Sequence, residues 1–402
     1  MIDKCKVPEI RFKGFSGEWE GSEFSGLVSR ITSMCDHLEL PRIEYEDIVS
    51  GSGILNKDVF KKKRIKRGVE FDEGDILFGK LRPYLNNLLW PHFKGIAVGD
   101  FWVLRANKTD AAFVYSFIQN SKFQYVANLS AGSKMPRSDW SIVSLSKFLI
   151  PASIKEQSQI GTFFQNLDSL ITHHQRKYDK LSTVKKAMLQ KMFPKDGADV
   201  PEIRFKGFTE KWKRRTLGEV IEISSAARVH KNEWTQTGVP FFRSSDVVAA
   251  YKGDANSKAF ISIELYQELT KLIGSVQRND VLVTGGGSIG IPYLVESNEP
   301  LYFKDADLLW FKKSENISGR FLYTFLTTTV FRGYVQSITH IGTISHYTIE
   351  QAKSTPIKLP NLYEQNKIEE FFQNLDSLIT LQQRELDKLK NIKKACLEKM
   401  FV

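Results

Sequence analysis

The stretch of the sequence that most clearly suggests a function is a run of cationic residues. Six of the seven residues in KKKRIKR, Lys61 to Arg67, are lysine or arginine. Such a density would neutralise several phosphates and make binding to a polyanion strongly dependent on salt. The alternative interpretation is a solvated surface loop. The candidate phosphate contacts in the run are Lys61, Lys62, Lys63, Arg64, Lys66 and Arg67.

Polar loops elsewhere carry the side-chain types that pair with base edges in the DNA major groove. They are expected at 79–87 (GKLRPYLNN), 131–140 (AGSKMPRSDW), 224–234 (SSAARVHKNEW), 241–246 (FFRSSD) and 339–347 (THIGTISHY). Each polar residue in them is a candidate for a base contact or a phosphate contact. The candidates are Lys80, Arg82, Tyr84, Asn86, Lys134, Arg137, Arg228, His230, Lys231, Arg243, Ser244, Ser245, His340, Thr343, Ser345 and His346.

A glycine-rich segment, GGGSIG at 285–290, satisfies G-x-G-x-x-G after the strand-like DVLVT. A dinucleotide site requires a helix to begin there, so that its N-terminus meets the phosphates. IPYLV follows instead, and Pro292 with the β-branched residues predicts a turn into another strand. We therefore interpret the segment as a flexible loop whose backbone approaches DNA, with Thr284 and Ser288 as further candidate contacts.

Motifs for autonomous catalysis are missing from the sequence. It contains no G-x-S-x-G, no H-E-x-x-H and no phosphate loop ending in G-K-[ST]. Cys5, Cys35 and Cys396 form no C-x-x-C pair, and His173, His174, His340 and His346 lack cysteine neighbours at metal-ligand spacing. We expect no catalytic site, no metal and no cofactor bound by this chain.

The composition favours a cytoplasmic protein with a polyanionic partner. The 402 residues suffice for two or three domains, and 57 Lys and Arg against 46 Asp and Glu give a net charge of +11. The N-terminus has no apolar signal segment, and no run approaches the ~20 apolar residues that span a bilayer. We expect a cytoplasmic location without membrane contact.

Two internal repeats organise the elements that must position these loops. VPEIRFKGF occurs at 7–15 and again at 200–208, and FFQNLDSLIT occurs at 163–172 and again at 371–380. Between the repeated strips the two halves share almost no letters. Matched frames around divergent interiors predict one mechanical task performed twice on two different targets.

Each repeated FFQNLDSLIT lies in a segment with helical periodicity. Apolar residues alternate by threes and fours, and no glycine or proline occurs from 162 to 193, before Pro194. Chain connectivity requires the two helices to pair antiparallel, if they pair, and His174 with Gln382 would form one polar layer that fixes the register. The alternative is that each amphipathic helix packs only on its own domain. The predicted pairing residues are Ile160, Phe163, Leu167, Leu170, His174, Leu181, Val184, Met188, Ile368, Phe371, Leu375, Leu378, Gln382, Leu389, Ile392 and Cys396.

The variable interiors have an α+β pattern. DILFG, GDFWVLRA, DVLVTG and DLLWFKK are short β-prone runs, and helical stretches follow at 110–121 and 318–329. The predicted fold class is α+β, with two globular mixed α/β domains separated by two long helices in an antiparallel coiled coil, and a pseudo-two-fold internal repeat. The predicted domains are 1–153, a long helix at 154–194, 195–359, and a second long helix at 360–402.

This organisation resembles the specificity subunit of type I restriction-modification systems. The resemblance covers the whole chain and rests on the repeated helices, on PASIKEQ at Pro151 and PNLYEQ at Pro360, and on GFSGEW and GFTEKW before the two bodies. It implies two target-recognition domains that each read one half of a split asymmetric site in double-stranded DNA. The helices would set the spacer between the half-sites and dock two methyltransferase subunits, to which restriction (translocase) subunits can be added.

The same resemblance assigns the cofactors to partner subunits. S-adenosylmethionine would bind the methyltransferase subunits, and ATP with Mg would serve the restriction subunits. Two other classes of function stay open at this point. One is a cytoplasmic assembly scaffold with incidental basic loops; the other, disfavoured by the missing motifs, is an autonomous DNA methyltransferase or nuclease.

Overall fold

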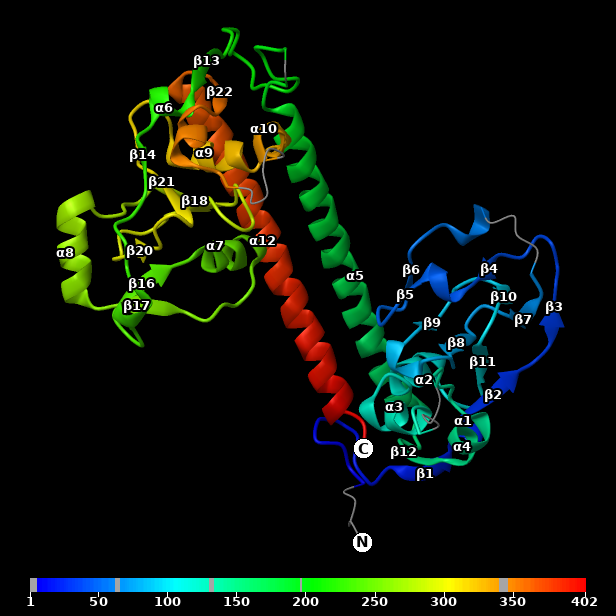
Figure 1. The fold of residues 1–402 in the computed structure, drawn as a ribbon. Coiled ribbons are helices and arrows are strands. Elements are labelled where there is room, and N and C mark those ends of the chain that lie inside the picture. The colour runs from blue at the N-terminus through cyan, green and yellow to red at the C-terminus, as the bar shows by residue number, and fades with distance from the viewer. Residues whose placement is uncertain (1–5, 62–65, 130–133, 196, 340–345) are drawn as a thin grey trace. The chain divides into compact units, whose positions relative to one another are not determined.

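The computed structural model describes residues 6–61, 66–129, 134–195, 197–339 and 346–402. The chain forms two compact units (Figure 1): unit 1 consists of Met1–Arg176 with Gln382–Val402, and unit 2 consists of Lys177–Leu381. Each unit contains one globular body, which we call body 1 (residues 20–150) and body 2 (residues 213–359). Each unit also contains part of two long helices, α5 (Ile154–Lys191) and α12 (Leu362–Lys399).

Body 1 is built on two four-stranded sheets, ordered β3-β7-β10-β4 and β2-β11-β8-β9. One apolar cluster lies between these sheets, and a larger one joins the second sheet to α2, α3 and the long helices. Its elements are β1 (Glu20–Glu23), α1 (Phe24–Leu27), β2 (Val28–Ile31), β3 (Met34–Cys35), β4 (Arg42–Ile43), η1 (Tyr45–Asp47), β5 (Ile48–Val49), β6 (Ile54–Leu55), η2 (Val59–Lys61), β7 (Gly68–Phe71), β8 (Ile76–Gly79), η3 (Pro83–Leu85), β9 (Leu88–Leu89), β10 (Gly95–Ala97), β11 (Phe101–Ala106), α2 (Ala111–Phe117), α3 (Ser121–Ala127), α4 (Trp140–Leu145) and β12 (Lys147–Ile150).

Body 2 has the corresponding sheets, ordered β15-β17-β16-β20 and β14-β21-β18-β19. Its elements are β13 (Lys213–Thr216), α6 (Leu217–Val220), β14 (Ile223–Ser224), η4 (Lys231–Glu233), β15 (Trp234–Thr235), β16 (Val239–Phe242), α7 (Ser244–Lys252), β17 (Ala259–Ile261), α8 (Ile263–Ile273), β18 (Val281–Thr284), β19 (Pro292–Leu294), β20 (Tyr302–Phe303), β21 (Leu308–Phe311), α9 (Gly319–Leu326), α10 (Thr329–Thr339), α11 (Ile349–Lys353) and β22 (Pro356–Leu359).

The strands that the sequence predicts are present, and GGGSIG turns into strand β19 as expected. The two bodies share most of their strand pairing although they share few letters. In both, the only parallel pairing among the described strands is that of β4 with β10 and of β16 with β20, but the edge strand of this pair is β4 in body 1 and β20 in body 2. Each body also begins and ends in a two-stranded antiparallel ribbon, β1 with β12 and β13 with β22.

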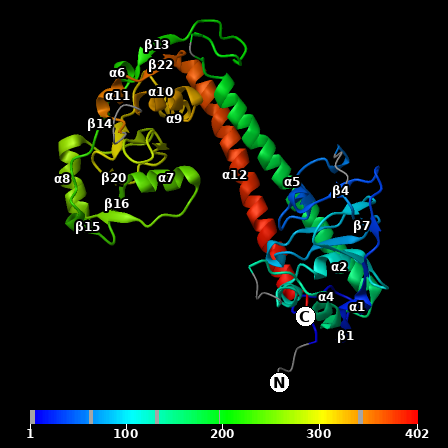
Figure 2. The same ribbon diagram turned by 45° about the vertical axis from the view of Figure 1, so that its right-hand side comes forward.

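The long helices lie side by side and antiparallel (Figures 1 and 2). In unit 1, Lys393 of α12 forms an ion pair with Asp168 of α5 at 2.6 Å, and burial of Asp168 raises the pKa of its carboxyl group. In unit 2, the corresponding residues of the repeat, Lys185 and Asp376, pair at 2.5 Å. Equivalent residues of the two repeats therefore make equivalent contacts between the helices.

The buried stripe of each helix differs in phase from part of the predicted seam. Phe164 and Phe372 are buried, whereas their predicted neighbours Phe163 and Phe371 are half-buried. Leu170, Leu378 and Ile392 are 47, 45 and 38 % exposed, which corrects their assignment to the seam. A strict seam repeats every 3.5 residues, but a helix turns every 3.6, so the stripe drifts off these positions. Of the other predicted residues, Ile160, Leu167, Ile368, Leu375 and Gln382 are buried, and His174, Leu181, Val184, Met188, Leu389 and Cys396 are half-buried.

His174 and Gln382, the same position of the two repeats, contact each other: His174 Nδ1 lies 2.8 Å from Gln382 Oε1. We expect Gln382→Leu to lower the free energy of unfolding by about 1–2 kcal/mol, because the half-buried ring of His174 loses its hydrogen-bond partner. The double variant with His174→Leu should recover most of that loss. Urea unfolding of both single variants and the double variant measures this coupling. If the losses in unfolding free energy of the two single variants simply added up in the double variant, His174 and Gln382 would not be coupled.

Within the described residues, no helix has the length and apolar character needed to cross a membrane. The same part of the chain contains no group of three or more His, Cys, Asp or Glu side chains arranged to hold a metal ion.

Candidate functional site

The repeated sequence strips form a clasp at the start of each long helix. In unit 1, Arg11 donates two hydrogen bonds to Glu156 at 2.7 and 2.9 Å, and Trp19 Nε1 donates to the same carboxylate at 3.4 Å. These bonds raise the pKa of the Arg11 guanidinium. Unit 2 repeats the clasp with Arg204, which bonds Glu364 twice at 2.7 Å, and with Trp212 at 3.4 Å.

The strips also close the opposite end of the partner helix. The Ile10 N–H donates to the Lys399 carbonyl near the end of α12 at 3.0 Å, and the Ile203 N–H donates to the Lys191 carbonyl of α5 at 2.9 Å. Carbonyl groups at a helix C-terminus lack partners within the helix, so this backbone bond satisfies one of them. The repeated Arg, Trp and Glu residues therefore hold the start of each long helix in place. The variable bodies provide a different surface in each unit.

In body 1, backbone bonds gather two of the predicted polar loops after strand β8. The Lys80 N–H donates to the Asp100 carbonyl at 2.9 Å, and the Ser138 N–H donates to the Lys80 carbonyl at 2.8 Å. The Tyr45 hydroxyl donates to the same Asp100 carbonyl at 2.5 Å, and burial raises the pKa of this tyrosine. We call this cluster locus 1: Tyr45, residues 80–82, Asp100 and residues 136–138.

The side chains of locus 1 surround one carboxylate. Asp100 accepts hydrogen bonds from Arg137 Nε and Nη2 at 3.2 and 3.1 Å, and it lies 3.5 Å from Lys80 Nζ. Arg82 is exposed, and Tyr84 on η3 is 58 % exposed. Asn86, which ends η3, is half-buried. The structure thus brings Lys80, Arg82 and Arg137 together as a small cationic group.

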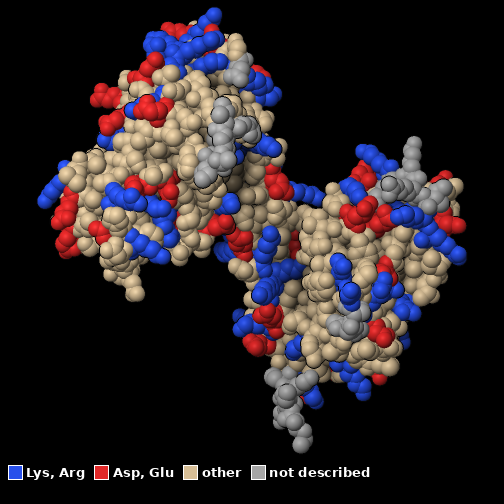
Figure 3. Space-filling model, viewed as in Figure 1, with Lys and Arg blue, Asp and Glu red and all other residues tan. Residues whose placement is uncertain are grey.

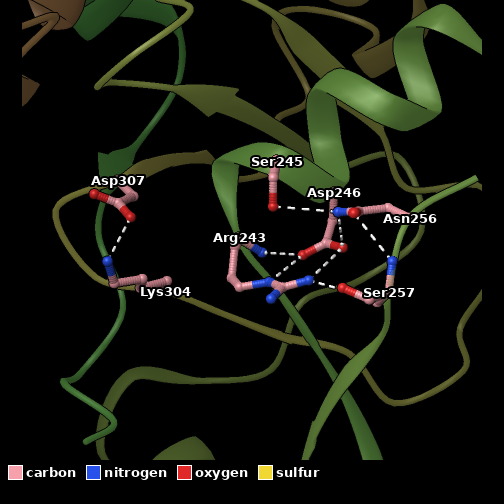
Figure 4. Close-up of polar contacts among 7 residues, drawn as sticks. All are labelled: Arg243, Ser245, Asp246, Asn256, Ser257, Lys304 and Asp307. Carbon is pink, nitrogen blue, oxygen red and sulfur yellow. Dashed lines mark hydrogen bonds and ion pairs between the residues drawn. The ribbon is translucent and has the colours of Figure 1, made fainter. Parts of the chain in front are cut away.

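Body 2 builds the same cluster from other residues. The Gly285 N–H donates to the Asp307 carbonyl at 2.8 Å, and the Tyr347 N–H donates to the Gly285 carbonyl at 2.8 Å. The Ser244 hydroxyl donates to the Asp307 carbonyl at 3.0 Å, as Tyr45 does to Asp100. The Asp307 carboxylate pairs with Lys304 at 2.6 Å (Figure 4). We call this cluster locus 2: Ser244, residues 285–287, Lys304, Asp307 and residues 346–347.

The two loci match position by position on one backbone scaffold. β8 pairs with β11 and β18 pairs with β21 in the same way. Asp100 and Asp307 occupy the same position, directly before β11 and β21. The side chains on this scaffold differ: Lys80, Arg82 and Arg137 correspond to Gly285, Gly287 and His346. Sequence analysis missed Tyr45, Asp100, Lys304 and Asp307, although an Asp directly before each of two strong strands was a usable signal.

Two predicted contacts in body 2 have hydrogen-bond partners within the scaffold. Thr284 is fully buried, and its hydroxyl accepts the Ile291 N–H at 2.9 Å and donates to the Ser288 carbonyl. Arg243 is held by Asp246 at 2.8 and 3.1 Å and by the Ser257 carbonyl (Figure 4). Because Thr284 is fully buried, its prediction as a DNA contact is corrected, whereas that of Arg243 stays a prediction. The hydrogen-bond partners of both side chains are not visible in the sequence.

The segment FFRSSD is likewise not a loop. Its aromatic residues end strand β16, and its serines begin helix α7 with Asp246 bonded to the Arg243 N–H at 2.9 Å. A carboxylate in the first turn favours a helix start, because it accepts a free N–H there. Ser245 is exposed and accepts a hydrogen bond from Asn256 at 3.2 Å (Figure 4).

The remaining candidates are dispersed. Lys61 pairs with Asp58 at 3.2 Å, and Lys66 pairs with Glu44. On the face shown in Figure 3, lysine and arginine side chains lie among acidic ones on both bodies, so charge alone does not mark a site there. Lys62, Lys63, Arg64, His340, Thr343 and Ser345 lie outside the described residues. Exposed candidates besides those in the loci are Lys61, Lys66, Arg67, Lys134, Arg228, His230, Lys231 and Ser288.

Comparison with known proteins finds similarity to one family. Residues 209–391 match the family model of the type I restriction modification DNA specificity domain. The chain is 24 % identical over 282 residues to the type I restriction enzyme MjaVIII specificity subunit of Methanocaldococcus jannaschii, an alignment that covers 68 % of this chain and 65 % of that protein. This part of the chain is thus similar to the DNA specificity domain of type I restriction-modification systems, and the longer alignment is to a specificity subunit.

A second curated protein is similar to the chain over a shorter stretch. A putative type I restriction enzyme specificity subunit of Haemophilus influenzae is 27 % identical over 164 residues, which cover 40 % of each protein. The chain thus spans less than two thirds of the length of either of these curated specificity subunits in alignment.

Solved structures confirm the predicted fold class. A type I restriction-modification S subunit from M. genitalium matches with a TM-score of 0.59 at 14 % identity over 98 % of this chain and 99 % of that one. A chain from a study of assembly and conformational transition of the type I R-M system matches with a TM-score of 0.51 at 18 % identity over 94 % and 96 %. The fold described above, with two mixed α/β bodies and antiparallel long helices, is therefore shared with that S subunit.

Proposed function

We propose that this chain recognises the DNA target of a type I restriction-modification complex and that each body reads one half of a split, asymmetric site. The observation that carries the proposal is the pair of loci: one backbone scaffold occurs in both bodies, with different side chains on it. Identical clasps frame the two bodies, so the chain repeats its mechanical parts and varies the parts that meet a target. Two linked weak readers gain affinity when both half-sites are present.

The long helices have a second role in this proposal. They set the spacer between the half-sites and dock two methyltransferase subunits, which bind S-adenosylmethionine and can recruit restriction subunits that use ATP and Mg. The matching chain from the study of type I R-M assembly supports this role by fold alone. The proposal divides the chain at 1–153, 154–194, 195–359 and 360–402, and the chain itself binds no cofactor.

The cationic run gives a direct test of DNA binding. Replacing Lys61, Lys62, Lys63 and Arg64 by alanine should weaken binding to every duplex, whatever its sequence, because cations in such a run contact phosphates. The slope of log affinity against log salt should become shallower by about 0.9 for each lost phosphate contact. Fluorescence anisotropy with a labelled duplex across a salt series measures both effects.

A charge-matched control separates local contacts from net charge. Replacing the exposed Lys13, Lys108, Lys147 and Lys155 by alanine changes the net charge equally and should leave the salt slope near that of the original chain. If the original chain is not retained on DNA at moderate salt, the assembly scaffold becomes the better interpretation. Methyl transfer by the isolated chain would instead identify an autonomous enzyme.

A further inference from the structure

We propose that Arg82 and Arg137 are the specificity-determining side chains of body 1 and that they read guanine in its half-site. This inference rests on the proposed function and deepens it, because it names the base and the groups that select it. The two arginines come from different predicted loops, which the Leu81 and Arg137 backbone bridge and the bond from the Arg82 N–H to the Pro136 carbonyl, at 2.8 Å, hold together.

The backbone at Arg82 gives the first argument. Arg82 has a φ of +50°, in the left-handed region that favours glycine. The matching residue of body 2 is Gly287, with a φ of +68°. The turn thus needs this conformation in both bodies, and body 2 has glycine there, the residue that adopts it at the least cost. An arginine held there in the other body indicates that its side chain is needed at that point.

The side chains give the second argument. Arg82 is exposed, and its guanidinium makes no hydrogen bond or ion pair with any residue that the structure describes, so its donors are available to a ligand. Arg137 is oriented by the Asp100 carboxylate, which accepts from its Nε and Nη2. A guanidinium fixed in this way is held in a defined geometry beside Arg82.

The donors of the locus match the edge of a base. The Asp100 carboxylate lies 3.1 Å from Arg137 Nη2 and 3.5 Å from Lys80 Nζ, so it offsets part of the positive charge that would attract a phosphate. The major-groove edge of guanine is neutral and presents two acceptors, O6 and N7. The fork of an arginine fits both, and this is the commonest specific contact between proteins and DNA. Locus 2 has Gly287 and His346 at these positions, so its half-site should not depend on arginine.

The test uses the full chain in complex with its methyltransferase subunits and a pool of duplexes with randomised sequence. Sequencing the bound duplexes should show a split motif with guanine in one half. Arg82→Gly and Arg137→Lys should each reduce the preference for that guanine roughly tenfold or more, while the other half stays unchanged. Lysine keeps the charge but lacks the planar fork, so Arg137→Lys should weaken a bidentate guanine contact much more than a phosphate contact.

Lys108→Gly is the matched control. Lys108 is an exposed cation of body 1 with a φ of +53°, and its substitution removes the same charge and the same backbone strain outside locus 1. The control should keep the motif, and Arg82→Gly should not lower the melting temperature, because glycine suits this turn. An unchanged guanine preference in both arginine variants would overturn the inference and leave the proposed function standing. Failure of the original complex to select any motif would refute the proposed function itself.

Discussion

Replacing Glu364 by alanine should lower the free energy of unfolding of unit 2 by about 3–5 kcal/mol, the cost of removing one partner from a buried ion pair. Its carboxylate accepts both bonds from Arg204 and the bond from the Trp212 indole, and the Glu364 and Arg204 side chains are only 1 and 12 % exposed. The variant leaves a guanidinium and an indole N–H without their acceptor. Hydrogen exchange by mass spectrometry should show lost protection in unit 2, and unit 1 should keep its own.

The same sequence strip supplies the control. Glu202 forms an exposed ion pair with Lys195, and pairs of this kind contribute at most about 1 kcal/mol. Glu202→Ala should therefore leave the protection of unit 2 almost intact. Glu156→Ala should instead cause the large loss of protection in unit 1, because Glu156 accepts hydrogen bonds from Arg11 and Trp19 there. Equal effects of Glu202→Ala and Glu364→Ala would show that the clasp does not stabilise the unit.

The repeated letters made much of the frame predictable. FFQNLDSLIT revealed the paired helices and the His174 and Gln382 contact, since periodicity and connectivity are properties of the sequence alone. The phase of the seam was less predictable. Leu170 and Leu378 fit a strict heptad but are exposed in the structure, where the buried stripe follows the true turn of the helix.

The loci could not be predicted as clusters. Lys80, Asp100 and Ser138 meet through backbone bonds between residues far apart in the sequence, and backbone bonds leave no mark in the letters. For the same reason, the sequence did not show that locus 1 and locus 2 occupy equivalent positions in the two bodies. Thr284 shows the opposite failure: it is a polar residue in a promising segment, but it is buried and held by neighbours in the scaffold.

Each body is bounded like an exchangeable module. Glu20 pairs with Ile150 across the ribbon that opens and closes body 1, and Lys213 pairs with Leu359 in body 2. A body can therefore be replaced between adjacent points of the chain. We expect body 2, residues 213–359, to fold when it is grafted in place of residues 20–150.

The surfaces on which each body packs also match. In unit 1, Phe113 and Phe117 of α2 contact Phe401 at 5.8 and 5.9 Å between ring centroids. In unit 2, Phe321 and Phe325 of α9 contact Phe193 at 5.5 and 6.3 Å. Phe401 and Phe193 end the two copies of the same Lys-Met-Phe sequence. A grafted body 2 would thus meet Phe401 where it now meets Phe193.

The measurement that tests the central claim most directly is the methylated motif of this graft. Cells that express the chain with its methyltransferase subunit are sequenced for modified adenines, beside cells with the body 2 graft and cells with the reciprocal body 1 graft. We predict that the original chain marks a split motif with two different halves, that one graft marks the body 2 half twice, and that the other marks the body 1 half twice. A folded, active graft that keeps the original motif, or that changes both halves to new sequences, would contradict independent reading by the two bodies.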